Sequence, residues 1–151
     1  MKAQTYAAEK GCDQVLWLDA VEHSFLEEIG TSNAFVMIDD EIITPPLTGT
    51  ILPGVTRDSV ILLLKKWGLK VTERNIRISE VADAAKSGRL QEVFSSGTAA
   101  VISPVGTLVY KDEDIIIGDG GVGELANKLY NTIYGIQTGA HPDDMDWTIE
   151  V

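Results

Sequence analysis

The chain of 151 residues is 44% hydrophobic and carries a formal net charge of −11. This apolar content suits one globular domain with a sizeable core and argues against a disordered chain. The acidic balance disfavours nucleic acid and anionic membranes as partners, because both repel a negatively charged surface.

The first predicted elements are a short helix and a strand. Residues 1–11 (MKAQTYAAEKG) contain good helix formers, and Gly11 can close the helix in the left-handed conformation. No capping residue precedes this pattern, so it resembles the last turns of a longer helix. Residues 14–19 (QVLWLD) form a short continuous apolar run, which predicts a strand buried on both faces.

A hairpin and a second helix follow. Residues 34–45 contain two β-type runs around Asp39 and Asp40, which predicts a hairpin that ends at Pro45. The next apolar residues recur at helical spacing, and Gly68 is expected to end that helix. These residues are Val60, Leu63, Leu64 and Trp67.

The second half of the chain continues the mixture of strands and helices. Residues 69–78 predict a strand, and Ser79 is expected to cap a short helix over residues 80–88. Residues 92–110 predict strand, loop, strand and turn, and residues 114–117 are expected to continue the sheet. Residues 122–136 predict a final amphipathic helix. The whole pattern predicts one mixed α/β domain, of the α+β kind, over residues 1–151.

Cysteine usage and the apolar runs exclude several classes of protein. Cys12 is the only cysteine, so an intrachain disulfide and a cysteine-based zinc site are ruled out, and no metal site is expected. We expect Cys12 to be a partly buried apolar residue in a reducing, cytoplasmic setting. No secretory signal is expected, and no apolar run reaches the roughly 18 residues of a membrane span.

The first candidate site is the predicted start of the Val60 helix. Gly54, Val55 and Thr56 would present free backbone N–H groups and the positive end of the helix dipole, which together bind anions such as phosphate. The alternative is a plain helix cap by Thr56 or Asp58. Arg57 could contact a phosphate or could be a surface cation.

Two further segments carry candidate chemistry. Residues 95–100 (SSGTAA) follow a predicted strand, where Gly97 permits a close backbone approach and Thr98 supplies N–H and O–H donors. An ordinary turn is the alternative.

Glu27 and Glu28 are adjacent, so in an extended chain they face opposite sides, and one can point inward while the other is solvated. The alternative is that both lie on the surface.

Together these segments resemble a known family. The stretches EEIGTSN (27–33), TPPLTGTILPGVTR (44–57) and SSGTAAVISPV (95–105) are similar to motifs of the branched-chain-amino-acid aminotransferases, which are fold-type-IV enzymes dependent on pyridoxal phosphate. Residues 11–19 and the closing segments from residue 129 resemble the same family. The resemblance implies the C-terminal domain of this fold, which is like that of D-amino-acid aminotransferase, with a mixed β-sheet pseudo-barrel and surrounding helices.

The resemblance also implies roles for single residues at the cofactor. Glu28 matches the glutamate that pairs with the pyridine nitrogen, and a carboxylate there keeps that nitrogen protonated. Leu52 matches the residue that packs on the ring. The phosphate contacts match Gly54, Val55, Thr56, Gly97 and Thr98.

On the substrate side, Thr31 matches a residue that lines the site, and Thr98 and Ala99 match backbone donors near the α-carboxylate. Asn33 is expected to support the loop, and Glu27 to be the solvated neighbour of Glu28.

One departure from the family pattern concerns the catalytic lysine. In the family this lysine forms a Schiff base with the cofactor, and none of the eight lysines of the chain matches its position. The resemblance places that lysine, a phosphate-binding arginine and a smaller N-terminal domain upstream of the residues present. We therefore expect the C-terminal, cofactor-binding half of an aminotransferase, without a catalytic residue of its own.

Two classes of function remain open. The first is transfer of an amino group between leucine, isoleucine or valine and 2-oxoglutarate, in which case activity requires the N-terminal half and a homodimer or self-association is expected. The second is a non-catalytic module that retains the fold and an anion site. Related enzymes acting on D-amino acids or aminodeoxychorismate are a further alternative, although VLWLD and TPPLTGTILPGVTR favour the branched-chain group.

Overall fold

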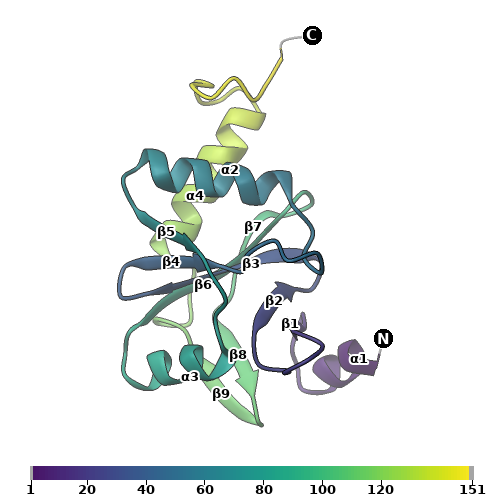
Figure 1. Ribbon diagram of the computed structural model, residues 1–151. Coiled ribbons are helices and arrows are strands. Elements are labelled where there is room, and N and C mark those ends of the chain that lie inside the picture. Colours follow the sequence, from purple (N-terminus) through teal and green to yellow (C-terminus); the bar gives the residue numbers. More distant parts are fainter. Residues whose placement is uncertain (1, 150–151) are drawn as a thin grey trace.

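A seven-stranded mixed sheet forms the centre of the molecule, and a computed structural model describes residues 2–149 of the chain (Figure 1). The first five elements are α1 (Lys2–Glu9), β1 (Leu16–Leu18), β2 (Leu26–Ile29), β3 (Ser32–Ile38) and β4 (Glu41–Thr44). They are followed by α2 (Val55–Lys66), β5 (Lys70–Glu73), α3 (Ile78–Lys86), β6 (Leu90–Gly97), β7 (Val101–Pro104), β8 (Thr107–Tyr110), β9 (Glu113–Ile116) and α4 (Glu124–Gln137). The predicted mixed α/β fold is confirmed.

Strand β3 organises the sheet because three other strands pair with it. Strand β6 runs antiparallel along one edge of β3, from Asn33 opposite Ser96 to Ile38 opposite Leu90. A strand has only two edges, so β2 and β4 must share the other edge. There β2 pairs with residues 32–33 and β4 pairs with residues 36–38. The two strands therefore part from each other beside the middle of β3.

A parallel pair of strands determines where α2 begins. Strands β4 and β5 are parallel, with Thr44 opposite Glu73, and α2 forms the crossover between them. In such a unit, the helix starts near the carboxyl end of the first strand. The loop of residues 45–54 therefore carries the chain from the end of β4 to the N-terminus of α2, at the edge where β2 and β4 part.

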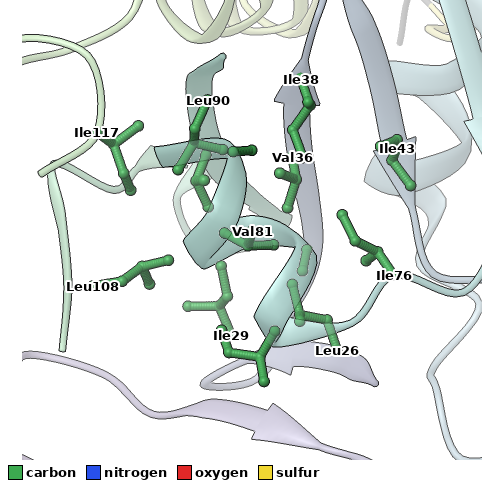
Figure 2. Packing of buried hydrophobic residues seen from close by; sticks show 14 residues of the cluster. Leu26, Ile29, Val36, Ile38, Ile43, Ile76, Val81, Leu90, Leu108 and Ile117 are labelled. Atoms are coloured by element: carbon green, nitrogen blue, oxygen red, sulfur yellow. The ribbon is translucent and has the colours of Figure 1, made fainter. Parts of the chain in front are cut away.

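Two apolar clusters pack on opposite faces of the sheet, because alternate residues of a strand point to opposite sides. Ala34, Val36 and Ile38 of β3 lie on the face covered by α3, where Val81 sits among the buried side chains (Figure 2). Phe35 of β3 lies on the other face, packed with residues of α2 and α4. Phe35 and Phe94 stack there with ring centroids 5.1 Å apart. Figure 1 shows α2 and α4 together on one side of the sheet and α3 on the other.

Several local predictions are confirmed. Asp39 and Asp40 both have positive φ angles, of 50° and 63°, and form the tight turn between β3 and β4. Gly68 follows α2 with a φ angle of 72°, in the left-handed conformation that ends helices. The apolar residues at helical spacing in α2 are buried, apart from the half-buried Trp67.

Three local predictions are wrong. Strand β1 is half-buried rather than buried on both faces, because it lies at an edge of the sheet. Residues 114–117 do not continue the main sheet, since β8 and β9 form a separate two-stranded sheet. Ser79 does not cap α3: that helix begins at Ile78, whose buried side chain anchors it, and its N-cap residue is Arg77.

Candidate functional site

Helix α2 begins without a side-chain cap. Its N-cap residue is Gly54, in an extended conformation, and the first helical bond runs from the Asp58 N–H to the Gly54 carbonyl. Thr56 and Asp58 lie inside the first turn and do not cap it, so the interpretation of either as the cap is wrong. The N–H groups of residues 55–57 have no acceptor within the helix, and they carry the positive end of its dipole.

Two side chains hold the loop immediately before this helix start. The amide of Asn33 donates from Nδ2 to the carbonyl of Leu52 at 2.8 Å, and Glu28 Oε1 accepts from the N–H of Leu52 at 3.1 Å. Asn33 and Glu28 are opposite each other on β3 and β2, so they reach the loop from the same face of the sheet. The expected support of the loop by Asn33 is confirmed.

Gly54 is required at its position by this packing. A Cβ atom there would overlap Oδ1 of Asn33 and would also contact the Arg57 side chain. The φ angle of Gly54 is −70°, which any residue can adopt, so the need for glycine is steric and not conformational. The absence of a side chain also leaves the approach to the first turn of α2 open.

The adjacent glutamates have different partners. Glu27 is half-buried, and its Oε1 accepts a hydrogen bond from the Thr50 hydroxyl at 2.7 Å, so it is a partly solvated residue with a partner in the loop. Glu28 uses Oε1 for Leu52, as described above. Each glutamate therefore holds a different part of the loop of residues 45–54.

Arg57 is buried and forms an ion pair with Glu73, so it is not a surface cation. Its side chain is only 4% exposed, and Nη2 donates to the Pro45 carbonyl at 2.9 Å and to Glu73 Oε2 at 2.8 Å. The guanidinium therefore points along the sheet edge, towards the ends of β4 and β5. The interpretation of Arg57 as a surface cation is therefore wrong, and a direct phosphate contact stays a prediction.

The second candidate loop, residues 98–100, joins β6 to β7. Gly97 is opposite Val101, and Val101 has a φ angle of 60°. This left-handed conformation is strained for a β-branched residue, and such strain is concentrated in tight turns and functional loops. Thr98 and Ala99 are exposed. The loop starts two residues after Ser96, which lies opposite Asn33, and Asn33 in turn contacts the loop before α2.

The predicted substrate-side residues face a cleft. Thr31 and Ala99 line a cleft of about 1010 Å³, together with Ser95 and with residues of α1, β1 and β8. Ser95 lies opposite Ala34, on the face of the sheet that α3 covers. The candidate residues thus form two groups, one at the start of α2 and one in this cleft. The turns at residues 30–31 and 98–100 contribute Thr31 and Ala99 to the cleft, and a Cβ on Gly97 would be 2.6 Å from the hydroxyl of Ser32.

Sequence reasoning did not find the pairing of Arg57 with Glu73 or that of Thr50 with Glu27. Both join residues more than 15 positions apart, and no local pattern links them. The positive end of the helix dipole disfavours a cation in the first turn of a helix. The presence of Arg57 in that turn was the one sequence feature that could have indicated a specific partner for it.

No helix within residues 2–149 is long and apolar enough to cross a membrane. No group of three or more histidine, cysteine, aspartate or glutamate side chains in the same range could hold a metal ion.

The chain is similar to known proteins over its whole length. Residues 1–108 match the family described as amino-transferase class IV. The chain is 57% identical to branched-chain-amino-acid aminotransferase 2 of Bacillus subtilis (strain 168), over 100% of the chain and 42% of that protein. It is 40% identical to branched-chain-amino-acid aminotransferase 5, chloroplastic, of Arabidopsis thaliana, over 35% of that protein. The chain therefore spans less than half the length of these relatives.

Solved structures match the fold closely. The branched-chain amino acid aminotransferase from Escherichia coli superposes with a TM-score of 0.79 at 31% identity, covering 96% of the chain and 45% of that protein. A T.th. branched-chain amino acid aminotransferase complexed with N-(5'-phosphopyridoxyl)-L-glutamate superposes with a TM-score of 0.79 at 30% identity. It covers 97% of the chain and 45% of that protein. The expected fold is confirmed by these matches.

Proposed function

The chain belongs to the class IV aminotransferase family, and we propose that it is the C-terminal, cofactor-binding part of a branched-chain-amino-acid aminotransferase. The proposed reaction moves an amino group between leucine, isoleucine or valine and 2-oxoglutarate. The names of the similar proteins from Bacillus subtilis and Arabidopsis thaliana support this choice of substrates. A cytoplasmic setting is part of the proposal, and the single free cysteine is compatible with it.

The observation that carries the proposal is the uncapped start of α2. Free N–H groups and a helix dipole bind phosphate readily, and among residues 2–149 no hydrogen bond from the N–H groups of residues 55–57 to a side chain is recorded. In the proposal, Gly54, Val55 and Thr56 hold the phosphate of pyridoxal phosphate. Gly54 allows the phosphate to approach the backbone, and the hydroxyl of the half-buried Thr56 adds a donor.

Glu28 is the residue that we propose for the pyridine nitrogen of the cofactor. Oε1 of this carboxylate is held by the N–H of Leu52, which orients the side chain and fixes it beside the loop that leads to the phosphate site. Among residues 2–149, no hydrogen bond or ion pair is recorded for its other oxygen, Oε2. In the proposal, Oε2 accepts a hydrogen bond from the protonated ring nitrogen. A carboxylate in that position stabilises the protonated ring, and the bound cofactor supplies the electron sink needed to labilise the α-proton of an amino acid.

Exposed apolar side chains beside the helix start fit an aromatic ring. Leu52 is 67% exposed and Val55 is 85% exposed, although both are hydrophobic. Covering such groups with a planar ring removes apolar surface from water, which favours binding. We assign Leu52 to the face of the ring, in agreement with its position next to the Glu28 contact.

The loop after β6 would complete the site from another side. Gly97 and Thr98 are proposed to contact the phosphate, and the backbone N–H groups of Thr98 and Ala99 the substrate carboxylate. Pairing of Ser96 with Asn33 brings this loop towards the one before α2. Thr31 and Ala99 line the same cleft, whose volume of about 1010 Å³ is ample for an amino acid.

The lysines favour dependence on a further segment. Lys10 pairs with Asp112, Lys66 with Asp144 and Lys70 with Glu41, while Lys128 lies over the ring of Trp67. Of these four lysines, only Lys10 lines the cleft that Thr31 and Ala99 share, and its Nζ is bonded to Asp112. We therefore propose that the catalytic lysine comes from a segment outside these 151 residues, and that the residues alone bind an anion without catalysing transfer. This non-catalytic module is the second candidate function.

Assembly is also part of the proposal. An apolar surface that includes Leu52 and Val55 is expected to be covered in the complete enzyme, by the smaller domain, by a second copy or by both. We propose a homodimer for the complete protein and self-association for the isolated 151 residues.

The test is an amino-transfer assay of the chain joined to an N-terminal half taken from a similar protein, and of the 151 residues alone. We expect the joined protein to use leucine, isoleucine and valine with 2-oxoglutarate, and the 151 residues alone to be inactive. Preference for a D-amino acid or for aminodeoxychorismate would redirect the substrate assignment to the related enzymes. Full activity of the 151 residues alone would contradict the placement of the lysine.

A further inference from the structure

Arg57 lies in a position that local physics disfavours. It is the third residue of α2, where the helix dipole is positive and a cation is destabilising. It is also 4% exposed, so its charge is largely removed from water. Among the buried side-chain atoms of residues 2–149, its Nε is one of the two that lack a hydrogen-bond partner. An arginine held there without full compensation calls for another reason.

The contacts of Arg57 connect the helix start to two strands. Nη2 bonds the Pro45 carbonyl, where the loop of residues 45–54 leaves β4, and it also bonds Glu73 at the end of β5. The Cβ atom of Arg57 lies close to Gly54, at the other end of the same loop. The side chain therefore spans the base of the loop and fixes the first turn of α2 against the parallel strand pair.

We propose that Arg57 is a positioning residue for the anion site at the start of α2, and that its charge also raises the affinity of that site. The inference rests on the proposed phosphate site and adds a residue that does not touch the anion itself. The guanidinium is one side-chain length from the first-turn N–H groups, within the screening length of about 8–10 Å in physiological salt. An anion bound to those groups would stabilise the buried cation, and the cation would stabilise the anion.

Glu73 makes the electrostatic part of the inference measurable. Its side chain is 45% exposed and is the acidic partner of Arg57, at 2.8 Å. A Glu73→Gln substitution keeps a carbonyl oxygen that can accept the hydrogen bond but removes the opposing charge. Removing the charge of Glu73 also lowers its direct repulsion of the anion. The part that acts through Arg57 is therefore the gain in affinity that Glu73→Gln gives in the unsubstituted chain but not in an Arg57→Met chain.

A matched control is available at the far end of the same helix. Lys66 pairs with Asp144 at 3.5 Å, also between a cation of α2 and a carboxylate outside it. Asp144→Asn changes the net charge by the same amount as Glu73→Gln. It acts about 18 Å from the helix start, the length of a 12-residue helix, so screening removes most of its influence there.

The experiment is a titration of the full 151-residue chain with inorganic phosphate at low ionic strength, followed by the amide chemical shifts of residues 54–56. We expect Glu73→Gln to tighten binding by about three-fold and Asp144→Asn to leave it nearly unchanged. Arg57→Met should weaken binding about ten-fold, while Arg57→Lys, which keeps the charge but not the forked geometry, should lie between Arg57→Met and the unsubstituted chain. Thermal unfolding of each variant identifies any that fails to fold.

The outcomes separate the two ideas. If the unsubstituted chain shows no phosphate-dependent shifts at residues 54–56, the proposed phosphate site fails and the inference fails with it. If the chain binds phosphate but Glu73→Gln and Asp144→Asn change the affinity equally, the site stands and the charge of Arg57 plays no part. Binding by a folded Arg57→Met as tight as that of the unsubstituted chain would overturn the inference entirely. Should Arg57→Met fail to fold, Arg57→Gln, which keeps a donor for the Pro45 carbonyl but removes the charge, takes its place in both comparisons.

Discussion

Helices α2 and α4 begin in nearly the same way, yet their first turns have different partners. Both have a glycine at the N-cap in an extended conformation, with φ and ψ of −70° and 133° at Gly54 and of −66° and 153° at Gly123. At α4, Glu92 reaches over from β6, and its carboxylate accepts from Leu125 N at 2.8 Å and from Ala126 N at 2.9 Å. Among residues 2–149, no carboxylate is recorded that accepts from the first-turn N–H groups of α2, and the nearby Glu28 accepts instead from Leu52, which precedes the helix.

The comparison shows that the same backbone geometry at a helix start can have two different roles. A glycine N-cap leaves room in front of the first-turn N–H groups, and something negative is favoured there. In α4 the chain provides its own carboxylate, so the helix start is capped and its role is structural. In α2 the described part of the chain provides none and has the cationic Arg57 in the first turn, so an anion from solution is the natural complement.

The largest effect is expected from Glu92→Ala, which opens the start of α4. Two charge-assisted hydrogen bonds to backbone N–H groups are lost, and the free energy of unfolding should fall by about 3 kcal/mol. Glu92→Gln keeps one acceptor and should cost about half as much. Urea unfolding measures both, and a phosphate titration should leave the response of residues 54–56 unchanged. A loss below about 0.5 kcal/mol for Glu92→Ala would mean that α4 does not depend on this cap.

The next effect concerns the two glycines. A Cβ at Gly54 would overlap Asn33, and a Cβ at Gly123 would overlap Glu92, so Gly54→Ala and Gly123→Ala should each lower the free energy of unfolding by about 2 kcal/mol. Only Gly54→Ala should also abolish the phosphate response, because it displaces the amide that holds Leu52. Equal loss of phosphate binding in both variants would remove the distinction between the two helix starts.

The contrast also shows how far the sequence alone could reach. The Gly54–Thr56 helix start and the hairpin at Asp39 and Asp40 were predicted because each depends on local residue types. The support of the loop by Asn33 joins residues 19 positions apart and was predicted only from the family resemblance. Stop signals such as Gly68 are equally local, which is why the end of α2 was found.

The errors share a different cause. The cap of α4 by Glu92 could not be predicted, because the two partners are more than 30 residues apart. Burial of Arg57 against Glu73 and the separate sheet of β8 and β9 likewise depend on tertiary packing. The boundary of α3 was misplaced because the buried Ile78 competes with the capping preference of Ser79 and wins. The roles of Thr31, Thr98 and Ala99 stay predictions.

A smaller effect is expected for the two threonines assigned to the phosphate. Thr56→Ala and Thr98→Ala each remove a hydroxyl donor, so phosphate affinity should fall about ten-fold in each variant. Thr56 is half-buried and Thr98 is exposed, so the free energy of unfolding should change little. Amide shifts at residues 54–56 and 97–99 report the binding. A response confined to residues 54–56, insensitive to Thr98→Ala, would mean that the loop after β6 is no part of the phosphate site.

The smallest effect at neutral pH is expected at Asp19, a second place where the chain supplies its own carboxylate. This side chain accepts from the N–H groups of four residues that follow it, at distances from 2.6 to 3.2 Å. These residues are Val21, Glu22, Ser24 and Phe25. The bonds, led by that from Phe25, hold the pKa of Asp19 well below its usual range.

Because the pKa of Asp19 is lower in the folded state, its contribution to stability is fully present above about pH 4, the ordinary range for an aspartate, and is lost as the pH falls towards the native pKa. Asp19→Asn keeps one acceptor, so it should alter the free energy of unfolding only modestly at pH 7. It should also flatten the decline of stability below about pH 4. Urea unfolding as a function of pH measures this slope, with Asp83→Asn on the exposed face of α3 as the control. If the free energy of unfolding of Asp19→Asn declined below about pH 4 as steeply as that of the unsubstituted chain, the loop would not depend on its carboxylate. The start of α4 would then be the better example of backbone N–H groups bonded by a carboxylate of the chain itself.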